Sequence, residues 1–244
     1  MSDLTQRQRQ ILKSLIEEYM NTAQPVGSET LEKKYSLGAS PATLRNEMVR
    51  LTEMGFLKKP HTSAGRTPTP IGLKLYVKEL MKEQELSVAE EVAEKEKIWD
   101  FRSEFKNLIR EATRNLAART KNLALSATDG GDIYSAGTCH ILEMPEFYDI
   151  DVTRNLLSLL DQSDYFTKLI ERFIDDSEIN VLLGDDLGSD IYAGYGFVFS
   201  RFHGGDQEGV IGVLGPARLN YPSIIPQVRY FSDLIEEMIQ SLKK

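Results

Sequence analysis

Two polar side chains four residues apart, Asn46 and Arg50, could read the bases of double-stranded DNA. They lie in the stretch SPATLRNEMVRL, which begins at Ser40. An asparagine can bond the N6 and N7 edge of adenine, and an arginine can bond the O6 and N7 edge of guanine. Residues four apart lie on the same face of an α-helix. The spacing therefore suits a helix that lies in the major groove.

The sequence predicts where this helix starts and which of its faces is buried. Ser40 is a favoured N-cap, and Pro41 is favoured as the first helical residue because its missing N–H needs no partner there. Leu44, Met48 and Leu51 recur at i, i+4 and i+7, which predicts the core side. The opposite face and its flank hold Ala42, Thr43, Arg45, Asn46, Val49 and Arg50. For this helix taken alone, a solvated face without function is the alternative.

Basic and small polar residues follow. Gly55 ends the helix, and the next four residues, 56–59, read as a strand with Lys58 and Lys59 beside it. A loop then offers groups for phosphate or the narrow minor groove, namely His61, Thr62, Ser63, Gly65 and Arg66. An ordinary surface loop has the same composition, so the loop alone decides nothing. The order of helix, basic strand and glycine-containing tip predicts a recognition helix followed by a wing.

Further helices are predicted on either side. Thr5 and Gln8 form a capping box for a helix over 6–21. A break at 24–27 precedes a short helix that we expect Ser28 to cap. A fourth helix starts at Thr69-Pro70, and residues 1–84 are predicted to form a winged-helix DNA-binding domain.

Charge is distributed unevenly along the 244 residues. The chain carries a net charge of −8. Residues 1–82 hold 13 Lys/Arg against 8 Asp/Glu, a balance of +5, which leaves −13 for the remainder. A basic domain joined to an acidic body indicates a polyanion partner for the first part only.

The run PVGSETLEKKYSLGASPATLRNEMVRLTEMGFLKKPHTSAGRTPT resembles the N-terminal winged helix of the HrcA-type heat-inducible transcription repressors. The segments SPATLRNEM and PHTSAGR carry most of the likeness. The resemblance implies that residues 40–48 enter the major groove of an operator and that residues 61–66 form the wing. The helical-face argument reaches the same helix independently.

Residues 85–122 are predicted to form a long helical linker or dimerisation segment. Ser87 and Glu90 form a second capping box, and no Pro or Gly interrupts the pattern from Val88 to about Asn122. Two helices that meet near Trp99 fit this length, as does one long helix packed against a partner chain. For the C-terminal half, a helix lying on a sheet of the same chain is a further possibility.

Residues 123–244 mix strand and helix patterns. Asp129-Gly130-Gly131 is a turn signal that joins two strands into a hairpin. Strands are predicted over 123–128, 133–136, 179–183, 192–202 and 209–214, and helices over 152–160, 165–174 and 224–242. This pattern indicates an α+β domain.

The resemblance extends across this body, through HILEMPEFYD, the turn at 184–186 and GVIGVLGPARLNYPSIIP. The family's body is GAF-like, a fold otherwise known for binding small molecules. The predicted fold class is therefore α+β, with an N-terminal winged helix-turn-helix, a long helix and a reduced GAF-like regulatory domain. Full-length relatives are longer, with an inserted dimerising domain where this chain has only Asp129-Gly130-Gly131.

Other chemistry has little support. Asp185-Asp186 has no nucleophile or histidine at useful spacing, and a solvated turn explains it. The glycines from Gly209 to Gly215 lack the helix that follows a phosphate loop, so close packing in a strand is favoured. Three scattered histidines make no metal site, and the single cysteine, Cys139, is expected to be a buried small hydrophobe. We expect no enzyme activity, no metal and no cofactor.

No membrane or export signal is visible. The N-terminus is polar, and no apolar run approaches the roughly 18 residues of a membrane helix. We expect a cytoplasmic protein.

The sequence therefore predicts a DNA-binding transcriptional repressor of heat-shock or chaperone genes, which binds an inverted-repeat operator as a homodimer. The resemblance implies a GroE-type chaperonin as a further partner. A small-molecule-responsive regulator with a pocket in the GAF-like domain is the alternative. A structural DNA-coating protein with little sequence preference is a third possibility.

Overall fold

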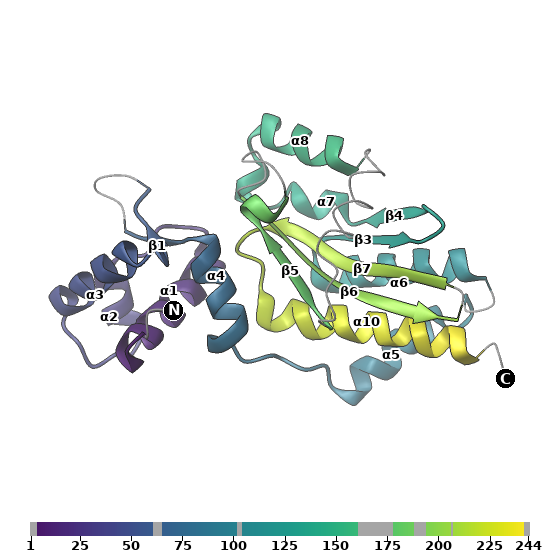
Figure 1. The fold of residues 1–244 in the computed structure, drawn as a ribbon, viewed down its shortest axis with the longest axis horizontal. Helices are drawn as coiled ribbons and strands as arrows, with labels where there is room; N and C mark the ends of the chain where they lie inside the picture. Colours follow the sequence, from purple (N-terminus) through teal and green to yellow (C-terminus); the bar gives the residue numbers. More distant parts are fainter. Residues whose placement is uncertain are drawn as a thin grey trace. The chain divides into compact units, whose positions relative to one another are not determined.

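The computed structural model describes residues 4–60, 65–101, 104–160, 178–187, 194–205 and 207–241. The chain divides into two units, Met1–Lys82 and Glu83–Lys244 (Figure 1). No helix within the described residues is both long and apolar enough to cross a membrane.

Three helices form the body of the first unit: α1 (Gln6–Thr22), α2 (Ser28–Lys34) and α3 (Pro41–Glu53). The capping box predicted for α1 is present, since Thr5 and Gln8 each accept from the other's backbone N–H. Ser40 caps α3 as predicted, with its hydroxyl 3.3 Å from the backbone nitrogen of Thr43. Both helix starts are thus fixed by local side chains.

The apolar stripes of α1 and α3 face each other in the core of this unit. Leu44, Met48 and Leu51 are buried, as their spacing predicted. They pack in the same unit as the buried α1 residues Ile11, Leu12, Leu15 and Ile16. The opposite face of α3 is left to solvent.

The prediction that Ser28 caps the second helix is wrong. Gly27 occupies the N-cap position, and no side chain caps α2. The reason lies one residue earlier, where Val26 exchanges two backbone hydrogen bonds of 2.9 Å with Arg66. This bridge holds the chain extended through Gly27, so the helix begins at Ser28 itself.

A small antiparallel sheet carries the wing. Its strands are β1 (Leu57–Lys58) and β2 (Thr67–Pro68), with Leu57 opposite Pro68. The predicted residues His61, Thr62 and Ser63 lie outside the described residues. Helix α4 (Pro70–Leu75) follows, capped by Thr69, and continues into a π-helical turn, η1 (Tyr76–Leu80).

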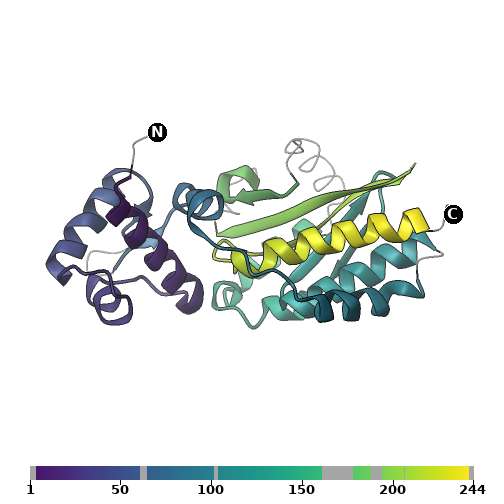
Figure 2. The same cartoon turned by 90° about the horizontal axis from the view of Figure 1, so that it is seen from below.

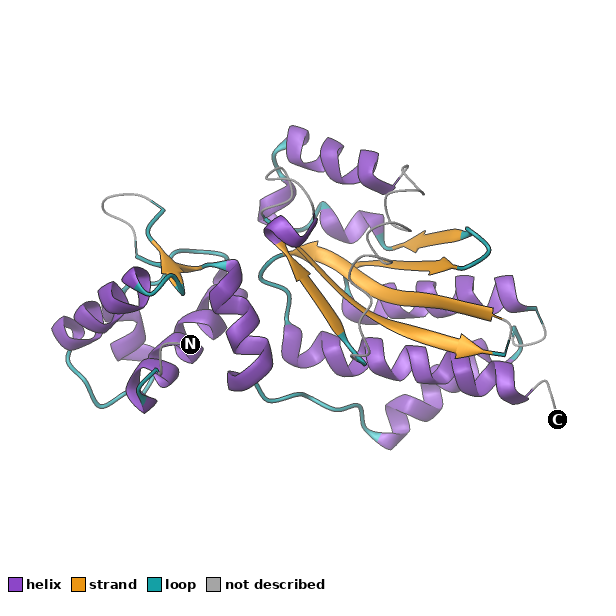
Figure 3. Ribbon diagram, viewed as in Figure 1, coloured by secondary structure: helices purple, strands orange, loops and turns teal. Residues whose placement is uncertain are grey.

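A five-stranded antiparallel sheet organises the second unit (Figure 3). Its spatial order is β4-β3-β7-β6-β5. The strands are β3 (Leu123–Thr128), β4 (Ile133–Ala136), β5 (Asn180–Leu183), β6 (Tyr195–Gly204) and β7 (Gln207–Pro216). The predicted hairpin is confirmed, because β3 and β4 pair across the turn at 129–131.

Three helices lie on one side of the five-stranded sheet: α5 (Val88–Trp99), α6 (Phe105–Thr120) and α10 (Tyr221–Ser241). Helices α6 and α10 run side by side along the sheet (Figure 2). Thr113 of α6 bonds Ser126 of β3 at 2.7 Å, and Ser232 of α10 bonds Ser200 of β6 at 2.9 Å. The segment 88–122 is thus two helices rather than one, and its second half lies on the sheet.

The other face of the sheet is covered by α7 (Thr138–Ile141), η2 (Pro145–Phe147) and α8 (Ile150–Leu160). Alternate residues of β6 point into this layer, where Phe197 stacks on Phe199 with ring centroids 4.9 Å apart. Phe147 packs on Tyr195 at 5.5 Å. The turn predicted at 184–186 lies in a 3₁₀ turn, η3 (Gly184–Leu187). The predicted helix over 165–174 lies outside the described residues.

The glycines of β7 serve close packing, as predicted. A Cβ on Gly212 would lie 2.4 Å from the carbonyl oxygen of Val198, and one on Gly209 would meet the ring of Phe202 at 2.4 Å. Cys139, by contrast, is exposed and not buried. It lies on the short helix α7, whose buried residue is Ile141.

Candidate nucleic-acid interface

The outer face of α3 gathers the residues predicted to read DNA. Ala42, Arg45, Asn46, Val49 and Arg50 are exposed, and Thr43 is half-buried. They face outward because Leu44, Met48 and Leu51 turn to the core on the other side. Val49 is an apolar side chain with 37% of its surface exposed, which suits contact with a thymine methyl.

Arg50 does not extend freely. Its Nη1 lies 2.9 Å from Oε1 of Glu47, and 64% of the Arg50 side chain is exposed against 13% for Glu47. The second carboxylate oxygen of Glu47 accepts from Nε2 of Gln8 at 3.0 Å. The arginine is therefore tied, through Glu47, to the N-terminus of α1.

A hollow of about 500 Å³ opens beside this face. It brings together residues of α3, the residue that follows β1, the base of the wing and the start of α2. Five residues predicted to bind DNA line it, namely Arg45, Val49, Lys59, Gly65 and Arg66. The basic side chains from separate segments thus converge on one surface of the first unit.

Arg66 lies at the base of the wing. Its Nε donates to the hydroxyl of Thr52 at 3.0 Å, and that hydroxyl donates to the carbonyl oxygen of Met48 at 2.8 Å. The backbone of Arg66 is paired with Val26. The side chain therefore links the wing to the last turn of α3, a role that the sequence did not suggest.

Gly65 is required where the wing meets the start of α2. A Cβ at this position would lie 2.3 Å from the carbonyl oxygen of Val26 and 2.9 Å from the nitrogen of Gly27. No side chain other than hydrogen fits there without a backbone shift.

Positive charge on this surface is available to phosphate. Lys58 of β1 and Lys59, which follows the strand, are exposed, whereas Leu57 of β1 is buried. Within the described residues, Arg45, Lys58 and Lys59 have no ion-pair partner. Glu18, in contrast, is held by Lys34 at 2.5 Å and by Tyr35, whose pKa is raised to about 12 by burial and by that carboxylate. The buried carboxylate of Glu18 is thus occupied by contacts within the first unit.

The sequence predicted Gln8 as part of a capping box but not its contact with Glu47, and it predicted no role for Glu47 or Thr52. The i, i+3 spacing of Glu47 and Arg50 could have signalled their ion pair. The contact of Gln8 with Glu47 spans 39 residues of sequence, and no local pattern announces it.

Comparison with known proteins also identifies the first unit as a DNA-binding domain. The family model for the winged helix-turn-helix transcription repressor, HrcA DNA-binding, matches residues 3–85, and the HrcA protein C terminal domain matches residues 72–225. The chain is similar to the heat-inducible transcription repressors HrcA of Roseiflexus sp. (strain RS-1) and Roseiflexus castenholzii. Identity is 28% and 29%, and each alignment covers 99% of this chain and 96% of the relative.

These alignments span 344 positions against the 244 residues of this chain, so about 100 positions of the relatives have no counterpart here. A solved structure, described as a hypothetical protein at 2.2 Å resolution, matches 98% of this chain and 99% of its own, with a TM-score of 0.80. At 18% identity this likeness shows the fold alone. The predicted winged-helix and α+β fold class is confirmed.

Proposed function

Because this chain belongs to the HrcA family of heat-inducible transcription repressors, we propose that α3 lies in the major groove of its operator and reads bases there. The observation that carries the proposal is the outward face of α3, where Asn46 and Arg50 are exposed one turn apart. The family's members are heat-inducible transcription repressors, which agrees with the function predicted from the sequence.

Thr43, Asn46 and Arg50 are the proposed base readers, because their side chains can form hydrogen bonds specific to a base edge. Ala42 and Val49 supply apolar contacts. The remaining proposed contacts are to phosphate or to the minor groove and come from Ser40, Arg45, Lys58, Lys59, His61, Thr62, Ser63, Gly65 and Arg66.

The repressor acts as a homodimer in this proposal. Two recognition helices then occupy successive major grooves of an inverted repeat, about 34 Å apart, and the bound dimer occludes the promoter. We divide the chain into a DNA-binding domain at 1–84, a linker and dimerisation segment at 85–122 and a GAF-like regulatory domain at 123–244.

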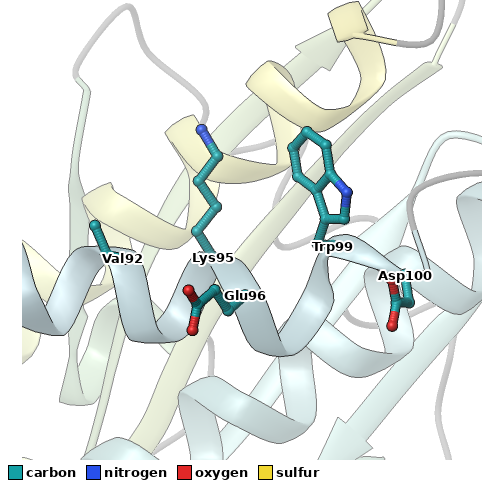
Figure 4. Close-up of a pocket in the computed structure, with 5 residues that line it drawn as sticks. All are labelled: Val92, Lys95, Glu96, Trp99 and Asp100. Atoms are coloured by element: carbon teal, nitrogen blue, oxygen red, sulfur yellow. The ribbon is translucent and has the colours of Figure 1, made fainter.

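An exposed stripe on α5 supports the dimer. Val88, Val92, Lys95 and Trp99 follow each other at alternating spacings of four and three residues, the pattern through which helices pair. Val88 is 75% exposed, Val92 49% and Trp99 39%. Figure 4 shows Val92, Lys95 and Trp99 on the same side of the helix, beside a hollow of about 360 Å³. Lys95 is ion-paired with Glu237 of α10 in the same chain, so Val88, Val92 and Trp99 are the residues of the stripe that a second copy would cover.

This stripe is small for an interface. Helix α5 has 12 residues and is about 18 Å long, whereas stable interfaces bury roughly 1,200–2,000 Å² in total. We therefore propose that the free protein dimerises weakly and that an inverted-repeat duplex completes the dimer.

Trp99 allows a direct test, because it is the single tryptophan of the chain. Its emission should shift to shorter wavelength when inverted-repeat duplex is added, and a Val92→Glu variant should lack the shift. Light scattering on the same samples should show two chains per duplex. One chain per duplex in the wild type would refute the dimer.

A GroE-type chaperonin is the second proposed partner, as the resemblance to the HrcA family implies. Added chaperonin should change operator binding by this protein.

The alternative of a small-molecule-responsive regulator gains no support from the described core, because Phe147, Tyr195, Phe197 and Phe199 fill the layer between the sheet and α8. A metabolite that raised the melting temperature would favour it.

The family consists of transcription repressors, which are not enzymes, and we propose that this chain has no catalytic activity. Because its partner is chromosomal DNA, we place it in the cytoplasm.

A further inference from the structure

A relay of hydrogen bonds runs from the N-terminus of α1 to the proposed base reader Arg50. The backbone N–H of Thr5 donates to Oε1 of Gln8 at 3.0 Å, and Nε2 of Gln8 donates to Glu47 at 3.0 Å. The other carboxylate oxygen of Glu47 accepts from Nη1 of Arg50 at 2.9 Å. Gln8 and Glu47, the two inner members, therefore each have a defined partner on both sides.

The direction of the relay is fixed by donor chemistry. A backbone N–H can only donate, so the oxygen of the Gln8 amide must face Thr5. The amide nitrogen then faces Glu47, and it can donate to a carboxylate. Gln8 is only 7% exposed, so packing holds it in this orientation.

A carboxylate beside a DNA-binding face is costly unless it has a task there. It repels phosphates and works against the attraction that dominates nonspecific binding. Glu47 lies in α3 between Asn46 and the core residue Met48, and its hydrogen bonds with Gln8 and Arg50 hold its carboxylate beside this face.

The contact of Glu47 with Nη1 leaves the Nε and Nη2 edge of Arg50 uncommitted to that carboxylate. This edge presents two parallel donors, which match the O6 and N7 acceptors of guanine. A guanidinium that is already oriented loses less side-chain freedom when it reaches the base. The same carboxylate discourages Arg50 from turning to a phosphate.

We propose that Glu47, oriented by Gln8, is a positioning residue that sets the sequence specificity of Arg50. The proposal rests on the proposed function, because it requires Arg50 to contact a base. It predicts that the charge of Glu47 lowers affinity for DNA in general while it raises the preference for the operator.

The test compares Glu47→Gln with Glu53→Gln in the full chain. Both variants remove one negative charge from α3 without a large change in shape. Glu53 is exposed and has no partner among the described residues, so its variant controls for charge alone. Dissociation constants are measured for a duplex obtained by in vitro selection with the wild type and for a random duplex of equal length. Melting temperatures confirm that each variant is folded at the temperature of the assay.

Both variants should bind random DNA slightly more tightly and by a similar factor. Glu47→Gln alone should lower the ratio of selected to random affinity, by about tenfold. In an Arg50→Ala background, Glu47→Gln should leave the ratio unchanged, because the positioned group is absent.

An unchanged ratio in Glu47→Gln would overturn the proposal, as would an equal fall in Glu53→Gln or a fall that persists without Arg50. Failure of the proposed function has a different signature. In that case Arg50→Ala by itself leaves the ratio at the wild-type value.

Discussion

The guanidinium Nε of Arg66 lies 3.0 Å from the hydroxyl oxygen of Thr52 and joins the base of the wing to α3. The same hydroxyl is bonded to the backbone of α3 at Met48, and the backbone of Arg66 is paired with Val26. The base of the wing, α3 and the α1–α2 connection therefore meet at one arginine.

Thr52→Val should loosen this junction. Valine keeps the shape of threonine but leaves the Arg66 guanidinium without its acceptor, which costs about 1–3 kcal/mol of unfolding free energy. Operator affinity should fall several-fold, since the wing is no longer held against α3. Urea unfolding and binding titrations measure the two effects. Thr120→Val is the matched control, because Thr120 makes the same bond to a carbonyl four residues earlier but has no arginine partner in the described part of the chain.

Lys58→Ala and Lys59→Ala should weaken binding to every DNA sequence by a similar factor. Both side chains are exposed, and in the proposed arrangement they contact only the sugar-phosphate backbone of the DNA. Each substitution should lower the slope of log affinity against log salt by about one. Lys121→Ala, an exposed lysine of the second unit, should leave the slope unchanged. A loss confined to the selected operator would show that these lysines read bases instead.

Gly65→Ala should destabilise the first unit. The added Cβ would lie 2.3 Å from the carbonyl oxygen of Val26, so the bridge between Val26 and Arg66 must open. We expect a loss of about 1–3 kcal/mol in unfolding free energy together with a loss of operator binding. Gly27→Ala adds the same methyl group, but its nearest neighbour is 4.0 Å away. If both variants melt alike, the close approach at Gly65 has no energetic role.

Acid should weaken the capping box at the start of α5 and, with it, the ion pair between Glu90 and Arg119 of α6. The pKa of Glu90 is lowered from 4.5 to about 2, first by the backbone N–H of Ser87, then by its hydroxyl and by Arg119. A lowered pKa means that the ionised form is favoured in the folded state. The stabilisation is therefore complete above pH 4.5 and is lost as the pH falls towards 2.

Melting temperatures between pH 6 and about 2 test this linkage. Glu90→Gln should melt below the wild type at pH 6 and approach it at the acid end. A constant difference across the range would show that ionisation of Glu90 contributes nothing.

Local signals made much of the fold predictable. The capping residues Thr5 and Ser40 mark helix starts through contacts within four residues, and the turn at 129–131 needs glycine for its own backbone. Leu44, Met48 and Leu51 reveal the outward face of α3 by exclusion. These features depend on short stretches of chain, so one sequence is enough to show them.

Contacts between distant segments could not be predicted in this way. Arg66 was expected at an exposed tip, and its bond to Thr52 exists only once the wing folds back on α3. Gln8 was recognised as a helix cap, but its second bond reaches Glu47. Cys139 was expected to be buried from the general behaviour of cysteine, whereas its place on a one-turn helix leaves it exposed.

Binding of the Asn46→Ala variant to selected and random duplexes tests the central claim most directly. If α3 reads bases, the substitution should weaken binding to the selected inverted repeat by about 1–3 kcal/mol and leave random DNA unaffected. Arg50→Ala should behave in the same way. An equal loss on both duplexes would contradict base readout by this face of α3.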